Sequence, residues 1–131
     1  MKNIKHFISM LTMLLLIGCS TSQPVLNMTS NPIPAKLSDQ QISRAIINAG
    51  ISKKWIMKEE RPGVIRGHIQ VRQHQATIDI PYTTHDYSIT YVNSVNLDDN
   101  GSGKIHRNYN RWIAGLNQAI QLELNRASNY Q

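Results

Sequence analysis

The chain has 131 residues, a formal net charge of +6 and a single cysteine. This length suits one domain with one hydrophobic core. One cysteine excludes an internal disulfide and any metal site built from several cysteines.

The first 18 residues have the pattern of a secretory signal peptide. Lys2 and Lys5 give a basic start, and residues 7–17 form an apolar run. At about 1.5 Å rise per residue, this run is too short to cross a hydrocarbon core about 30 Å thick. We therefore expect a cleaved signal and not a permanent transmembrane helix.

The run ends in Leu16-Ile17-Gly18-Cys19, which resembles the lipobox of bacterial lipoproteins. The resemblance implies cleavage before Cys19, followed by acylation of its thiol and of the new amino terminus. Several acyl chains anchor a protein stably, whereas one chain binds only marginally. Ser20, in place of an aspartate, implies sorting to the outer membrane, with the domain facing the periplasm. The alternative is an ordinary signal peptide followed by a chance cysteine.

Cleavage would leave 113 residues, and the loss of Lys2 and Lys5 would lower the formal charge to +4. Export argues against nucleic acid as a partner, and the basic residues are scattered along the chain. Anionic lipid headgroups, cell-wall polymers or an acidic envelope protein suit this charge better. A surface that is merely mildly basic is the alternative.

Residues 19–36 contain Ser, Thr, Asn and three prolines, and they show little periodicity. This composition predicts a flexible tether that holds a domain of residues 37–131 off the membrane. A helix follows, because Ser38 and Gln41 have the spacing of a capping box. Apolar residues recur at helical spacing up to Gly50, which we expect at the left-handed position after the helix.

Four strands with short connections follow the helix. Residues 55–60 are the first, and a Pro62-Gly63 turn joins it to residues 65–71. Residues 76–80 and 87–91 alternate apolar and polar side chains in the same way. The pattern predicts an antiparallel meander with one buried face.

Residues 98–103 read as a loop, and an amphipathic helix is expected to begin near Asn108. Gly115 within this helix suggests a point of close packing. The predicted fold is an α+β two-layer sandwich of order αββββα, in which the N-terminal and C-terminal helices cover one face of a four-stranded sheet.

The open face of this sheet is the first candidate binding surface. A connection centred on residues 73–74 would place His68 opposite Asp79, and a four-residue turn at 83–86 would place Thr90 opposite Asp79 and Tyr82 opposite Tyr87. The candidate binding residues here are Arg66, His68, Arg72, Asp79 and Thr90. A solvated sheet face without a ligand is the alternative.

Three residues of this face also permit a catalytic hypothesis. His68, Asp79 and Ser88 have the residue types of a hydrolytic triad. A triad is recognised by its geometry, however, and the sequence has no G-x-S-x-G elbow. A small hydrolase therefore remains only an alternative to a non-catalytic module.

The start of the last helix is the second candidate surface. Arg107 and Arg111 are four residues apart, and Asn110 lies between them. The free N–H groups at a helix start favour an anion, and two guanidinium groups would add to this preference. Alternatively, Tyr109 and Trp112 are core residues, and the arginines lie over them.

We expect no metal or other cofactor. Asn96, Asp98 and Asn100 before Gly101 mimic the first half of a calcium loop, but the position of its bidentate acid is Arg107. The histidines show no zinc-binding spacing.

Several segments together resemble a group of small proteobacterial lipoproteins of uncharacterised function. They are the lipobox, the residues around Ala49-Gly50 and Trp55, and the segments 62–65, 74–82, 87–91 and 105–112, the last reading IHRNYNRW. The resemblance implies an envelope lipoprotein but no activity. We therefore expect a non-catalytic binding or accessory module for an envelope complex or an anionic ligand. A purely structural lipoprotein is the remaining alternative.

Overall fold

The computed structural model describes residues 21–130, so the predicted signal peptide and Cys19 lie outside the described residues. Two helices are present, α2 (Asp39–Ser52) and α3 (Arg107–Asn129). The strands are β1 (Ser22–Pro24), β2 (Met28–Pro32), β3 (Ile56–Arg61), β4 (Val64–Val71), β5 (His74–Pro81), β6 (Asp86–Val95) and β7 (Lys104–His106).

The main sheet has five antiparallel strands in the order β2-β6-β5-β4-β3, and β1 pairs separately with β7. The α+β class and the meander from β3 to β6 are therefore confirmed. The predicted four-stranded sheet and the order αββββα are wrong, because β2 adds to the free edge of β6 and two further short strands form the second sheet.

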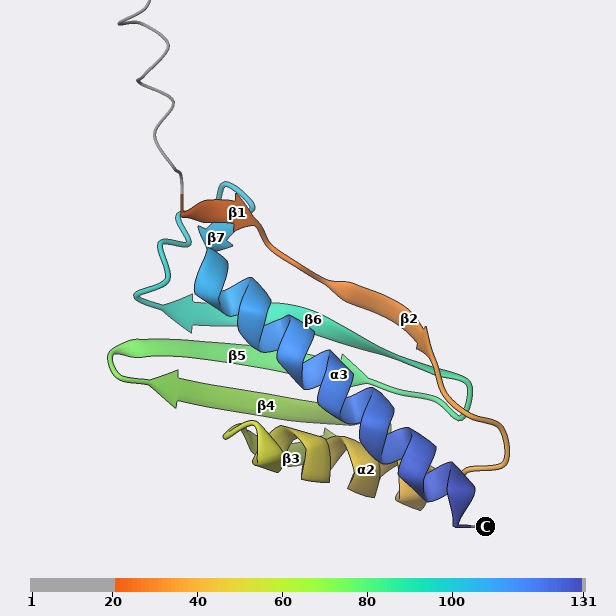
Figure 1. Ribbon diagram of the computed structural model, residues 1–131. Coiled ribbons are helices and arrows are strands. Elements are labelled where there is room, and N and C mark those ends of the chain that lie inside the picture. The colour runs from red at the N-terminus through yellow and green to blue at the C-terminus, as the bar shows by residue number, and fades with distance from the viewer. Residues whose placement is uncertain (1–20, 131) are drawn as a thin grey trace, which may run out of the picture.

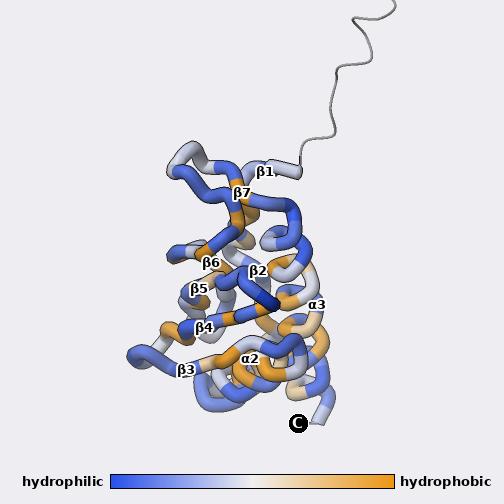
Figure 2. The backbone as a smooth tube through the Cα atoms, turned by 90° about the vertical axis from the view of Figure 1, so that its left-hand side faces the viewer, coloured by the Kyte–Doolittle hydropathy of each residue, from blue (hydrophilic) through white to orange (hydrophobic). Residues whose placement is uncertain are grey.

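Both helices lie on one side of the main sheet, and α3 crosses it obliquely (Figures 1 and 2). The core lies between these two layers and is built mainly from the isoleucines of α2, β4, β5, β6 and α3. Of the helices in the described residues, neither has the length and apolarity needed to cross a bilayer.

The N-terminal segment is not a flexible tether, at least from residue 21 onward. Ser22, Gln23 and Pro24 pair with β7, and β2 pairs with β6. Ile33 and Leu37 are buried in the core. Prolines are tolerated here because an edge strand does not need every backbone donor, so a proline-containing segment can still be ordered. The described domain therefore begins sixteen residues before the predicted boundary at 37.

The capping box of α2 is confirmed, since Ser38 and Gln41 exchange side-chain and backbone hydrogen bonds. The predicted helix end at Gly50 is wrong. The helix continues to Ser52, and Lys54 takes the left-handed conformation (φ 69°) in place of glycine. Gly50 instead gives space to Met57, because a Cβ at this position would lie 2.4 Å from Met57 Cγ.

The last helix begins close to the predicted residue. His106 caps it, and its Nδ1 accepts a hydrogen bond from the Asn108 backbone N–H. The buried Tyr87 hydroxyl joins the helix to β6 by donating to Asn117 Oδ1 (2.5 Å) and accepting from Gln121 Nε2 (2.8 Å). Burial raises the pKa of Tyr87 to about 12.

Replacement of Gly50 and of Gly115 by alanine should have different effects on the free energy of unfolding. A Cβ at Gly115 would meet nothing within 4 Å, so the expected close packing at this residue is wrong. Gly115→Ala should raise the free energy of unfolding by about 0.5–1 kcal/mol, which is the helix preference of alanine over glycine. Gly50→Ala should lose this gain, because Met57 would have to repack. Denaturant unfolding of both variants checks this, and equal gains would contradict the packing assigned to Gly50.

Candidate functional site

The open face of the sheet is organised by one ion pair. Arg66 lies directly opposite Asp79, with Arg66 Nε 2.8 Å from Asp79 Oδ1 and Nη2 3.1 Å from Oδ2. The hydrogen bonds from Arg66 hold the pKa of the Asp79 carboxyl below its ordinary value. Both groups therefore have their best partner within the protein.

The predicted pairing of His68 with Asp79 is wrong by two residues. The turn between β4 and β5 consists of Arg72 and Gln73, so His68 lies opposite Thr77. Arg72 adopts a left-handed φ of 57° in this turn. Glycine and asparagine are the residues that usually take this conformation, so an arginine gave no sign of it in the sequence. A shift of two residues keeps every side chain on its face but changes its partner.

The other residues of this face are placed as follows. Thr90 lies opposite Asp79, as predicted, and donates a hydrogen bond to the Asp79 carbonyl oxygen. The predicted bridge between Tyr82 and Tyr87 is also confirmed. Arg72 is exposed at the hairpin tip. Arg66, Asp79, His68 and Thr90 thus all have polar partners within the protein.

The three residues of the hydrolytic hypothesis have three separate partners. His68 Nδ1 shares a hydrogen bond with Thr77 Oγ1 (3.0 Å), and Asp79 binds Arg66. Ser88 Oγ accepts from the Ser30 backbone N–H (3.0 Å). A triad needs serine to contact histidine and histidine to contact the acid, so this geometry does not support catalysis at these residues.

The start of α3 is occupied by the protein's own N-terminal segment. Asn110 accepts a hydrogen bond from the Leu26 backbone N–H and donates to Pro24 O and Gln23 Oε1. The Arg107 backbone N–H donates to Thr21 O (2.9 Å). Two of the free N–H groups expected to hold an anion, those of Arg107 and Asn108, already have acceptors.

Asn110 is therefore a structural residue and not a free ligand contact. Arg107 and Arg111 remain exposed on the surface beside it. Tyr109 is fully buried and packs edge-to-face against Tyr91, as the alternative interpretation of this segment expected.

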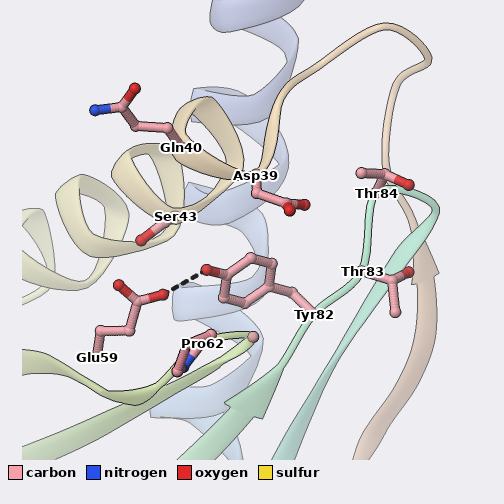
Figure 3. Close-up of a pocket in the computed structure, with 9 residues that line it drawn as sticks. Asp39, Gln40, Ser43, Glu59, Pro62, Tyr82, Thr83 and Thr84 are labelled. Atoms are coloured by element: carbon pink, nitrogen blue, oxygen red, sulfur yellow. Dashed lines mark hydrogen bonds between the residues drawn. The ribbon is translucent and has the colours of Figure 1, made fainter.

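A pocket that the sequence analysis missed lies where α2, the β3–β4 turn and the β5–β6 turn meet (Figure 3). Its volume is about 660 Å³. Its lining residues are Asp39, Gln40, Ser43, Glu59, Pro62, Gly63, Tyr82, Thr83 and Thr84.

Tyr82 and Glu59 form the polar centre of this pocket. The nearly buried Tyr82 donates a hydrogen bond of 2.6 Å from its hydroxyl to Glu59 Oε1, and Ser43 points toward the same place (Figure 3). Burial, followed by the hydrogen bond to Glu59, raises the pKa of Tyr82. The second carboxylate, Asp39, lies in the first turn of α2. The pocket is therefore rich in acceptors, although the chain as a whole is basic.

The alternation of side chains along β3 indicates on which side of the sheet Glu59 lies. Glu59 is two residues after Met57, so it lies on the side of β3 that faces the helices. Glu59 nevertheless stays exposed, because β3 is an edge strand of the sheet, so the alternation indicates the side on which it lies but not a pocket. Within residues 21–130, no cluster of acidic, histidine or cysteine side chains has the arrangement of a metal site.

Comparison with known proteins adds no family. No protein-family model matches the chain, and no curated protein matches it.

The Arg66–Asp79 pair predicts a pH dependence. Because the pKa of Asp79 is lower in the folded state, the pair stabilises the fold above the ordinary carboxyl pKa of about 4. This contribution disappears as the pH falls through the folded-state pKa. Asp79→Asn should therefore unfold at a lower temperature than the wild type at pH 7, and the difference should shrink toward pH 2.

Thermal unfolding across this range checks the prediction. Asp98→Asn, which removes a carboxylate from the loop after β6, is the control and should show no such trend. A difference between wild type and Asp79→Asn that stayed constant down to pH 2 would contradict it.

Proposed function

We propose that this chain is an acyl-anchored lipoprotein of the bacterial envelope and acts there as a non-catalytic binding module. Cys19 carries the lipid, the outer membrane holds the anchor, and the domain faces the periplasm. The pocket beneath the start of α2 receives a lysine or arginine side chain of an envelope partner protein.

The observation that carries the binding site is the presence of two carboxylates in the lining of one pocket. Glu59 lines it from β3 beside the Tyr82 hydroxyl, and Asp39 lines it from the start of α2 (Figure 3). A cationic side chain pairs well with carboxylates that are fixed by neighbouring groups. The hydrogen bond from Tyr82 holds Glu59 in place before any partner arrives.

The sheet face and the start of α3 are weaker candidates, because Arg66, Asp79 and Asn110 already have partners within the protein. Arg66 and Asp79 satisfy each other on the sheet face, and a ligand there would have to compete with a bidentate pair. Asn110 is occupied by residues 23–26. The pocket combines a hollow with two carboxylates, and its lining residues include no lysine or arginine.

The anchor is supported by the sequence pattern and by the contacts of Thr21. Thr21, two residues after the candidate acylated cysteine, is already bound to the folded domain. A lipid on Cys19 would therefore hold the domain at a membrane without any intervening segment of appreciable length.

Photo-crosslinking in living cells, with the full-length protein, tests whether the pocket binds a partner. A photo-reactive residue at Gln40, on the pocket rim, should trap a discrete protein, whereas one at Gln70 on the sheet face should not. Asp39→Asn/Glu59→Gln should reduce the Gln40 adduct severalfold, because the cationic side chain loses its counter-charges. Mass spectrometry of the adduct should locate the crosslink near a lysine or arginine.

Asp98→Asn/Glu123→Gln removes the same charge elsewhere and should leave the adduct unchanged. An adduct that survives the pocket substitutions would contradict the assigned site. Cys19→Ala tests the anchor separately: it should abolish palmitate labelling and release the protein from the membrane fraction. Membrane retention of Cys19→Ala would contradict acyl anchoring.

A further inference from the structure

The ordered N-terminal segment constrains how the domain can sit at a membrane. We propose that the end of the domain formed by β1, β7 and the first turns of α3 rests on anionic phospholipid headgroups. This inference rests on the proposed acylation of Cys19. It concerns the orientation of the whole domain and is independent of what the pocket binds.

The first argument is covalent reach. Thr21 is fixed to the first residue of α3, because its carbonyl oxygen accepts a hydrogen bond of 2.9 Å from the Arg107 N–H. Ser22 lies opposite His106 in the β1–β7 ladder. Two residues span at most about 7 Å, so an acylated Cys19 holds the membrane surface close to Arg107. A domain on such a short connection cannot turn freely.

The second argument is charge. Lys104, Arg107 and Arg111, which we call the basic end, are exposed and follow one another along β7 and α3. Within residues 21–130, none of the three forms a salt bridge. A basic residue near an anionic leaflet is attracted to its headgroups.

Two acidic residues lie in the loop that leads to the basic end. Asp99 is turned toward the protein, since its carboxylate accepts hydrogen bonds from the Tyr91 hydroxyl and the Gly101 N–H. Asp98 is exposed and reduces the net charge of this region. The short connection therefore sets the position, and the three cations favour an anionic over a neutral surface.

This orientation points the pocket away from the lipid. β6 begins beside the pocket at Asp86 and carries the chain to the end where β1 and β7 lie (Figure 1). A strand of ten residues spans about 30 Å. The pocket would thus open toward the periplasm, at a height where a soluble or membrane-bound partner could reach it.

The test uses full-length acylated protein in vesicles of phosphatidylethanolamine and phosphatidylglycerol. Cys19 is the only cysteine and its thiol is blocked by the lipid, so an introduced cysteine can carry a single fluorophore. Ser102→Cys places it in the loop next to β1, and Asn129→Cys places it at the C-terminal end of α3, about 33 Å along the helix from Arg107. Headgroup spin-labelled lipid should quench the fluorophore at position 102 at least about threefold more than the one at 129.

Charge variants refine the test. Arg107→Gln/Arg111→Gln should reduce this difference and make it equal in anionic and neutral phosphatidylcholine vesicles. Arg44→Gln/Lys53→Gln removes two exposed cations elsewhere and should change nothing.

The two possible failures are distinguishable. Equal quenching at 102 and 129 in anchored wild-type protein would overturn the orientation alone. If the wild-type protein does not float with the vesicles, the acyl anchor is wrong and the orientation falls with it.

Discussion

The hydrogen bonds of Asn110 connect residues 23–26 to the last helix. Its carboxamide accepts from the Leu26 N–H and donates to Pro24 O and Gln23 Oε1, so one side chain substitutes for backbone pairing along a segment that contains a proline. Together with the β1–β7 ladder and the Arg107–Thr21 hydrogen bond, it converts a stretch of tether-like composition into part of the domain. The position of any anchor at Cys19 relative to the fold depends on these contacts.

Elsewhere, the sheet face satisfies its own charges, whereas the pocket and the basic end do not. The sheet face uses its charges on itself, through Arg66 and Asp79, and such directly opposed pairs stabilise a sheet without any ligand. The pocket at Tyr82 is different, because Asp39 and Glu59 both line it and its lining residues include no lysine or arginine. The basic end and the pocket thus lie at opposite ends of β6, which gives the domain a membrane end and a partner end in our account.

Local patterns predicted the meander and the cap of α2, because both depend on neighbouring residues: period-two alternation marks β4 to β6, and Ser38 with Gln41 forms the capping box. The errors came from interactions between distant residues. Nothing near residue 24 indicates that Asn110 will bind it, and Arg72 has no sequence feature that marks its left-handed turn. Sequence also placed the candidate site on the sheet face, because the pocket forms only when Asp39, Glu59 and Tyr82 meet from three separate elements.

The most direct test of this account is hydrogen exchange of the backbone amides at the N-terminal junction, measured by NMR on the full-length protein. The amides of Val25, Leu26 and Arg107, which donate to Gly103 O, Asn110 Oδ1 and Thr21 O, should exchange at least about tenfold more slowly than an unstructured chain. Asn110→Ala should restore fast exchange at Leu26 while leaving Ile78 in β5 protected. Exchange of these three amides at unstructured rates in the wild type would show that residues 21–26 are a free tether and would contradict the account.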